Sequence, residues 1–157
     1  MATEIRKFRN EDAHPVSRII IDCFMKLDIG KHTQRGLEMQ IERNSPDEII
    51  KRSKAVNFFV AEEENKIVGI CGYDNEKVHR FFVDRNHHHK GIGTLLIEKV
   101  LNEAKENGMK KIKTWSTIYA QGFYEKNGFK RLKELNLPVG KNDIILIEME
   151  KNLSNVF

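Results

Sequence analysis

Two glycines stand where a β-rich run of residues gives way to an amphipathic helix pattern. The segment around them, residues 88–94, reads His-His-Lys-Gly-Ile-Gly-Thr. The first turn of a helix carries unpaired amides at the positive end of the helix dipole, and phosphate binds well there. Gly91 and Gly93 would let the backbone approach a pyrophosphate closely, because no side chain intervenes. The segment therefore predicts a phosphate cradle, with a tight turn before an ordinary helix as the alternative.

Two other phosphate-binding motifs describe this segment less well. A Walker A loop ends in Gly-Lys followed by Ser or Thr, whereas Lys90 precedes the first glycine here. The dinucleotide-binding fingerprint needs a third glycine at the position that Leu96 occupies in this chain. Neither motif is therefore predicted.

Two segments together resemble the motifs of one enzyme family. Residues 83–96 resemble motif A of the GCN5-related N-acetyltransferases (GNAT), in which Arg/Gln-x-x-Gly-x-Gly/Ala binds the coenzyme A pyrophosphate. Here His88 replaces the usual Arg or Gln, and Arg85 and His89 stand where proline and glycine are frequent. Residues 120–129, Ala-Gln-Gly-Phe-Tyr-Glu-Lys-Asn-Gly-Phe, resemble motif B, commonly written Ala-x-x-Phe-Tyr-x-x-x-Gly-Phe. The resemblance covers nearly the whole chain.

The resemblance implies which residues would hold acetyl-CoA. The glycine turn would contact the pyrophosphate, and the pantetheine arm would pair with the strand before it, where a backbone amide would polarise the acetyl carbonyl. Thr117 stands where the family often has a coenzyme-contacting Asn. The implied coenzyme-binding residues are Phe81, Phe82, Val83, His88, His89, Lys90, Gly91, Ile92, Gly93, Thr94 and Thr117.

The resemblance also implies N-acetyl transfer by direct attack of a primary amine on the thioester in a ternary complex. Tyr124, the motif B tyrosine, would be the general acid that protonates the departing thiolate. A free thiol titrates near ~8.5 and tyrosine near ~10, so this transfer is uphill unless the site adjusts the two values. The alternative for Tyr124 is a half-buried ring on an amphipathic helix, and the alternative for the whole chain is a noncatalytic coenzyme A-binding or acyl-sensing module.

No motif fixes the base that would deprotonate the amine. The candidates are His79, Glu76, Asp22 and Asp28. Of these, His79 and Glu76 lie on or just before the strand that leads to the glycine turn. His79 shares strand parity with Phe81 and Val83, which predicts that it points toward the core or the cleft. An ordinary surface or packing role is the alternative for each candidate.

The histidine run 87–89 does not predict a metal site. Adjacent histidines on an irregular loop rarely converge on one ion, and no carboxylate or Cys partner has the right spacing. Cys23 and Cys71 also lack metal-ligand spacing and are predicted to be small core residues in a reducing compartment. Acetyl-CoA as cosubstrate, and no metal, is the resulting expectation.

The elements that must position these motifs alternate along the chain. The predicted strands are Thr3–Phe8, Val56–Glu62, Lys66–Tyr73, Lys77–Val83, Lys111–Thr114, Phe129–Leu135 and Asp143–Glu150, and the helices start near Asn10, Ser45, Thr94 and Ala120. The stretch Asp28 to Asn44 is ambiguous. The order is β-α-α-β-β-β-α-β-α-β-β. The resemblance implies an α/β fold (α+β, with a central mixed, mostly antiparallel sheet flanked by helices) that splays between Val83 and Lys111.

Composition fits one globular domain over residues 1–157, with 39% hydrophobic and 32% charged residues. No apolar run approaches the ~20 residues that span a bilayer, which predicts a cytoplasmic protein with no membrane partner. The net charge of +4 is too mild to identify a partner. The basic cluster Lys105–Lys113 contains Glu106 and lacks an aromatic platform, so no nucleic-acid partner is expected.

The acceptor is expected to be an amine-bearing small molecule or peptide, and its identity stays open. The resemblance implies that specificity lies in Phe24 to Asn44 and Leu135 to Asp143, which are the least patterned parts of the chain. A homodimer that pairs through the final strands also stays open.

Overall fold

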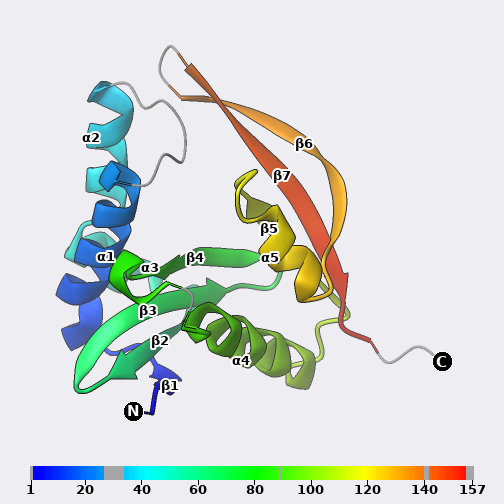
Figure 1. The fold of residues 1–157 in the computed structure, drawn as a ribbon, viewed down its shortest axis with the longest axis horizontal. Coiled ribbons are helices and arrows are strands. Elements are labelled where there is room, and N and C mark those ends of the chain that lie inside the picture. The colour runs from blue at the N-terminus through cyan, green and yellow to red at the C-terminus, as the bar shows by residue number, and fades with distance from the viewer. Residues whose placement is uncertain (1, 27–33, 89, 140–141, 155–157) are drawn as a thin grey trace.

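The computed structural model describes residues 2–26, 34–88, 90–139 and 142–154 (Figure 1). The strands are β1 (Glu4–Lys7), β2 (Asn57–Glu63), β3 (Lys66–Tyr73), β4 (Val78–Val83), β5 (Lys111–Ser116), β6 (Lys130–Val139) and β7 (Asn142–Asn152). The helices are α1 (Ala13–Lys26), α2 (Gln34–Arg43), α3 (Pro46–Arg52), α4 (Ile92–Glu106) and α5 (Gln121–Lys126), with 3-10 turns η1 (Asn10–Asp12) and η2 (Arg85–His87). No helix within these ranges has the length and apolar character needed to cross a membrane.

The element order confirms the predicted fold class but adds one helix. This helix, α2, lies in the stretch that the sequence left ambiguous, and it is followed by α3, whose N-cap Ser45 accepts a hydrogen bond from the Glu48 amide at 3.3 Å. Helix α2 reads Gln-Arg-Gly-Leu-Glu-Met-Gln-Ile-Glu-Arg. Its few apolar residues and internal glycine give a weak helix signal, and packing against α1 and α3 stabilises it instead.

The strands form two antiparallel sheets that diverge from one another. Strands β1 to β4 pair in chain order, and the second sheet has the order β5-β7-β6. In the described ranges, the backbone joint between them is a parallel bridge between Lys77 and Lys113, at which the Lys113 amide donates to the Glu76 carbonyl at 2.9 Å. The predicted splay between β4 and β5 is thus present, and Figure 1 shows the β6–β7 hairpin standing away from the first sheet.

Two hydrophobic clusters occupy opposite faces of the first sheet. The cluster under α1 and α3 consists of Val16, Ile20, Ile49, Val56, Phe58, Val60 and Ile70. The cluster under α4 continues beneath the second sheet, and its members include Phe59, Cys71, Val78, Leu96, Ile97, Ile112, Tyr124, Ile147 and Met149. Both cysteines are buried and unpaired, as the sequence predicted. Strand β4 therefore has one side facing α1 and α3 and the other facing α4.

A bulge interrupts β4 in the middle. Ile70 pairs with Phe82 but Gly72 pairs with His79, so β4 carries one extra residue, and Arg80 adopts a φ of 47°. The sequence-based prediction that His79 shares a face with Phe81 is therefore wrong, because the extra residue shifts the alternation of side chains. The bulge is also tied to the end of α2, since Arg80 Nε donates to Asn44 Oδ1 at 2.8 Å.

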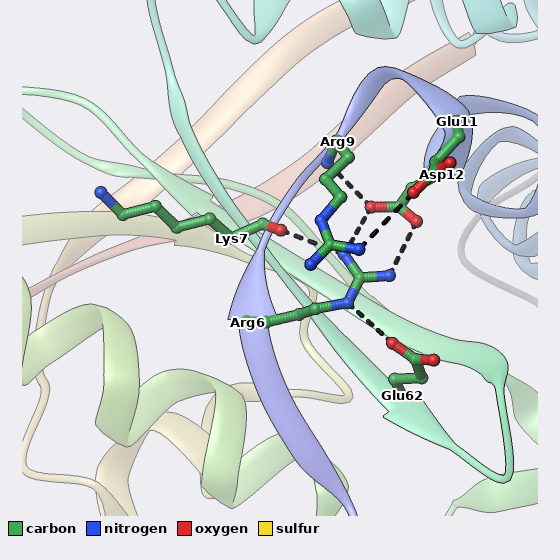
Figure 2. A network of polar contacts seen from close by, with 6 residues as sticks. All are labelled: Arg6, Lys7, Arg9, Glu11, Asp12 and Glu62. Atoms are coloured by element: carbon green, nitrogen blue, oxygen red, sulfur yellow. Dashed lines mark hydrogen bonds and ion pairs between the residues drawn. The ribbon is translucent and has the colours of Figure 1, made fainter.

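A buried charge network fixes β1 against the start of α1 (Figure 2). Arg6 donates to both carboxylate oxygens of Asp12, at 2.8 and 2.9 Å, and its Nε donates to Glu62 at 2.7 Å. The Arg9 amide donates to the same Asp12 carboxylate at 2.8 Å. These contacts join β1, η1 and β2, and so set where α1 begins on its face of the sheet.

Candidate active site

Aromatic side chains from β4 and α5 pack against one another where the two sheets diverge. The Phe81 ring centroid lies 5.5 Å from that of Phe123 and 6.2 Å from that of Tyr124. Tyr124 also packs against Phe123 at 5.6 Å and Phe129 at 5.2 Å. The structure thus brings together Phe81 and Tyr124, which the sequence assigned to one site from two distant segments.

The glycine turn leads into α4 beside this aromatic group. Gly91 is the N-cap residue of α4 with a φ of 79°, a left-handed conformation that side-chain-bearing residues rarely adopt. A Cβ atom at Gly91 would meet nothing within 4 Å, so its surroundings are open. A Cβ atom at Gly93 would stand 3.6 Å from both Phe81 and Phe123. The first turn of α4 therefore packs directly against Phe81 and Phe123.

The other residues predicted to bind the coenzyme lie in several different surroundings. Phe82 packs on the opposite face of the sheet, in the cluster under α1 and α3. His88 Nε2 lies 2.9 Å from the Val83 carbonyl oxygen, so this histidine folds back onto the end of β4. Ile92 is buried, Lys90 and Thr94 are exposed, and His89 lies outside the described residues. In this group the backbone near Val83 and the helix start are better placed for a ligand than the Phe82 and Ile92 side chains.

Thr117 lies in the loop between β5 and α5. Its Oγ1 accepts a hydrogen bond from the Ala120 amide at 3.2 Å, and its carbonyl oxygen accepts from the Ser116 hydroxyl at 2.6 Å. In this arrangement the Thr117 side chain shapes the turn into α5.

Tyr124 is enclosed by the protein. Its side chain belongs to a residue that is only 6% exposed, and its hydroxyl forms a hydrogen bond with Thr114 on β5. Burial raises the pKa of Tyr124 well above its ordinary value, although the Thr114 contact acts in the opposite direction. The phenol therefore stays protonated at neutral pH, which suits a proton donor and excludes a phenolate base.

The candidate bases differ in their surroundings. Asp22 forms ion pairs with Arg85 at 3.0 Å and Lys26 at 3.4 Å. Burial raises the pKa of Asp22, but the hydrogen bonds from Arg85 and Lys26 outweigh it and leave that pKa below its usual range, which makes Asp22 a weak base. Asp28 lies outside the described residues.

His79 and Glu76 both lie near the closed end of the splay. Glu76 is exposed in the turn between β3 and β4. His79 Nε2 lies 2.6 Å from Asp74 Oδ2, and the His79 side chain is 21% exposed. Sequence reasoning missed Asp74, although the turn sequence Asp-Asn-Glu-Lys five residues before His79 was a signal for a carboxylate near the start of β4.

Comparison with protein families gives a match over most of the chain. Residues 28–153 match the model of the acetyltransferase (GNAT) domain. An uncharacterized N-acetyltransferase of Methanocaldococcus jannaschii is 32% identical over 87 residues, which are 46% of this chain and 38% of that relative. The chain therefore spans well under half of this curated relative.

Solved structures share the fold across their whole length. A GCN5-related N-acetyltransferase of Rhodopseudomonas palustris superposes with a TM-score of 0.85 at 16% identity, covering 97% of this chain and 96% of that one. The PaiA N-acetyltransferase of Thermoplasma acidophilum, solved in complex with coenzyme A, gives a TM-score of 0.79 at 23% identity over 97% and 99% of the two chains. At these identities the likeness establishes the fold.

Proposed function

The chain belongs to the GNAT acetyltransferase family, and from this premise we propose that it transfers the acetyl group of acetyl-CoA to a primary amine. The proposal rests on one observation: a Cβ atom at Gly93 would lie 3.6 Å from both Phe81 and Phe123, so at this junction the start of α4 contacts these two aromatic side chains. There the first-turn amides of α4 lie beside the aromatic side chains of Phe81 and Phe123. A pyrophosphate needs the first feature and a pantetheine arm suits the second.

The residues at this junction fit acetyl-CoA, which supplies the activated acetyl group. The first-turn amides after Gly91 would hold the pyrophosphate, and the backbone from Phe81 to Val83 would pair with the pantetheine arm. The bulge at Arg80 interrupts the β3–β4 ladder just before this stretch, where a backbone amide would polarise the acetyl carbonyl.

Tyr124 is the proposed general acid. As the amine attacks the carbonyl carbon, the carbon–sulfur bond breaks and the electron pair leaves with sulfur, which takes the phenolic proton. The enclosed, protonated hydroxyl described above supports this role, and its contact with Phe81 places the Tyr124 ring beside the strand that would hold the arm. His79 and Glu76 are the proposed bases for the amine proton.

Calorimetric titration of acetyl-CoA into the purified protein tests the coenzyme site. Gly91→Glu places a carboxylate at the proposed phosphate cradle. Gly108→Glu is a matched control, because Gly108 has a φ of 85°, like the 79° of Gly91, and also has nothing within 4 Å of a Cβ position. The two variants share the same backbone strain at opposite ends of α4.

We expect the wild type and Gly108→Glu to bind and Gly91→Glu to bind at least about 10-fold more weakly, since like charges repel at close range. Equal weakening in both variants would mean that strain, not the cradle, explains the loss. No binding to folded wild type would remove the coenzyme site and the enzyme assignment with it.

A noncatalytic coenzyme A-binding module of the same fold is the second candidate. It would bind acetyl-CoA through the same junction yet release no thiol with any amine. The proposal also includes a single-domain, cytoplasmic protein and an acceptor that is a small molecule or a peptide. Pairing of two chains through the final strands is part of it as well.

A further inference from the structure

A carboxylate and an imidazole face each other at the β3–β4 turn. Asp74 Oδ2 lies 2.6 Å from His79 Nε2, while Asp74 Oδ1 accepts hydrogen bonds from the Glu76 and Lys77 amides, both at 2.8 Å. Burial raises the pKa of Asp74, but the two amides and His79 together lower it below the usual range. Asp74 is thus an ionised carboxylate held from both sides.

This geometry fixes the tautomer of His79. An ionised carboxylate only accepts hydrogen bonds, so His79 Nε2 must carry the hydrogen that lies between the two groups. In the neutral ring the lone pair is then on Nδ1. Asp74 therefore leaves Nδ1 as the ring atom that can take a proton from another molecule.

His79 and Tyr124 lie on opposite sides of β4. His79 pairs with Gly72, and a Cβ atom at Gly72 would meet Phe58 and Val56, which belong to the cluster under α1 and α3. Directly paired residues of antiparallel strands share a face, so His79 points to that side. Tyr124 belongs to the cluster under α4.

We propose that Asp74 is a positioning residue that holds His79 as the general base, and that the acceptor amine approaches from the α1 and α3 side while Tyr124 acts from the α4 side. This inference rests on the proposed acetyl transfer. The amine proton passes to His79 Nδ1 as the amine lone pair forms the carbon–nitrogen bond. Sulfur leaves with the bonding pair and takes the Tyr124 proton. The imidazolium then loses its proton to water and the phenolate regains one, so the products are the amide and free thiol.

Charged groups around this part of β4 are mainly cationic. Arg80 interacts with Arg43, Arg52 and Glu48 from the α2 and α3 side, and Lys77 lies 3.3 Å from the centre of the Trp115 ring. The Asp74 carboxylate is the group in hydrogen-bond contact with the His79 ring. Removing the Asp74 charge should therefore change the hydrogen-bonding and protonation of the His79 ring directly.

The competing explanation is that Asp74 only holds the turn. Asp74→Asn separates the two roles, because its amide oxygen still accepts from Glu76 and Lys77 while its NH₂ group donates to His79 Nε2. The turn is kept and the tautomer is reversed, which places the hydrogen on Nδ1. Long-range ¹⁵N–¹H correlation spectra report the tautomer without any acceptor. We expect Nε2–H in the wild type and Nδ1–H in Asp74→Asn, and the same tautomer in both proteins would overturn the inference.

Kinetics test whether the pair acts in catalysis. Thiol release is followed with acetyl-CoA and three probe amines, which are spermidine, a lysine-containing peptide and a tripeptide with a free N-terminus. We expect kcat to fall about 100-fold in Asp74→Asn and in His79→Gln with the KM for acetyl-CoA unchanged. We expect the wild-type rate to fall at low pH and this fall to be absent in His79→Gln. Asp47→Asn, an exposed residue of α3, is the matched control.

The double variant separates positioning from structure. If Asp74 acts through His79, adding Asp74→Asn to His79→Gln costs nothing further, whereas a purely structural role would lower kcat again. Wild-type rates and pH profiles in both single variants would overturn the base assignment while leaving acetyl transfer intact. A wild type that binds acetyl-CoA but releases no thiol with any probe would overturn both proposals.

Discussion

At the scale of single residues, burial decides what Tyr124 can do. Its hydroxyl contacts Thr114 and its ring is enclosed by Phe81, Phe123 and Phe129, so the phenol is kept neutral. A neutral phenol next to a developing thiolate is a proton donor, but burial also makes the transfer harder. Proton transfer from the buried Tyr124 is therefore favourable only if the departing sulfur lies against its hydroxyl as the carbon–sulfur bond breaks. A pantetheine arm in the splay between the sheets would bring the sulfur there.

Replacing Tyr124 with phenylalanine tests this role. We expect Tyr124→Phe to bind acetyl-CoA as the wild type does and to lose about 100-fold or more in kcat, because the donor is gone while the ring contacts remain. Tyr119→Phe is the matched control, since Tyr119 is 71% exposed in the loop before α5. Thiol release at saturating acetyl-CoA measures both. Full kcat in Tyr124→Phe would return this residue to a packing role.

Asp12 makes stability depend on pH. Burial raises the pKa of Asp12, but hydrogen bonds from Arg6 and the Arg9 amide outweigh it and hold that pKa below its ordinary value. A carboxylate with a depressed folded pKa adds stability above its unfolded pKa, near ~3.9, and this stability is lost as pH falls through the folded pKa. The loss is therefore expected below about pH 4.

Asp12→Asn should lower the free energy of unfolding by about 3 kcal/mol at neutral pH, at the low end for a broken buried pair because Arg6 keeps Glu62. The difference between the wild type and Asp12→Asn should shrink as the pH falls from 6 toward 3. Urea unfolding at each pH measures it. A difference that stays constant with pH would show that the Asp12 charge contributes nothing.

At the scale of elements, Arg80 couples the β4 bulge to α2. Its Nε donates to Asn44 at 2.8 Å and its Nη2 to the Arg43 carbonyl at 3.2 Å, which places a cation at the C-terminal end of that helix. Its φ of 47° costs a non-glycine residue on the order of 1–2 kcal/mol. Side-chain contacts therefore hold a strained backbone at the strand that the acetyl group would reach.

Two substitutions at Arg80 separate these effects. Arg80→Gly and Arg80→Val both lose the contacts with α2, but only valine keeps the backbone strain and adds a branched Cβ. We expect the free energy of unfolding of Arg80→Val to be about 1–2 kcal/mol lower than that of Arg80→Gly. Chemical denaturation of the two variants gives the difference. Equal stabilities would mean that the bulge relaxes when the arginine is removed.

The sequence predicted the elements that carry local signals and missed those that depend on pairing. Glycines and helix periodicity placed α4 and α5, but nothing local marks the bulge at Arg80, which shows only in the pairing of β3 with β4, where β4 carries one extra residue. The strand predicted to end at Leu135 extends as β6 to Val139, and the missing amide of Pro138 is tolerated there because β6 is an edge strand. The Asp74–His79 contact was likewise not predicted, because the bulge decides which face His79 takes, even though the turn sequence marked a carboxylate near the start of β4.

At the scale of the whole molecule, the two sheets meet at the proposed coenzyme-binding surface. The cluster under α4 spans both sheets, while the backbone joint in the described ranges is the bridge of Lys77 with Lys113. A ligand held by β4 and α4 on one side and by β5 and α5 on the other would therefore link the two halves. The fold brings the segments that carry the two motifs side by side.

Acetyl-CoA should accordingly stabilise the joint between the sheets. At a ligand concentration 100 times the Kd, the free energy of unfolding should rise by about 2.7 kcal/mol by mass action. Hydrogen exchange should slow at the Lys113 amide, which donates to Glu76 at 2.9 Å, because opening this joint would release the ligand. Exchange by NMR, with and without acetyl-CoA, measures this. Gly91→Glu, with a Kd at least about 10-fold higher, should gain no more than about 1.4 kcal/mol at the same ligand concentration and show less slowing of exchange. Stabilisation of the wild type without slower exchange at Lys113 would place the ligand away from the splay, since only a ligand that bridges β4 and β5 protects the bond between them.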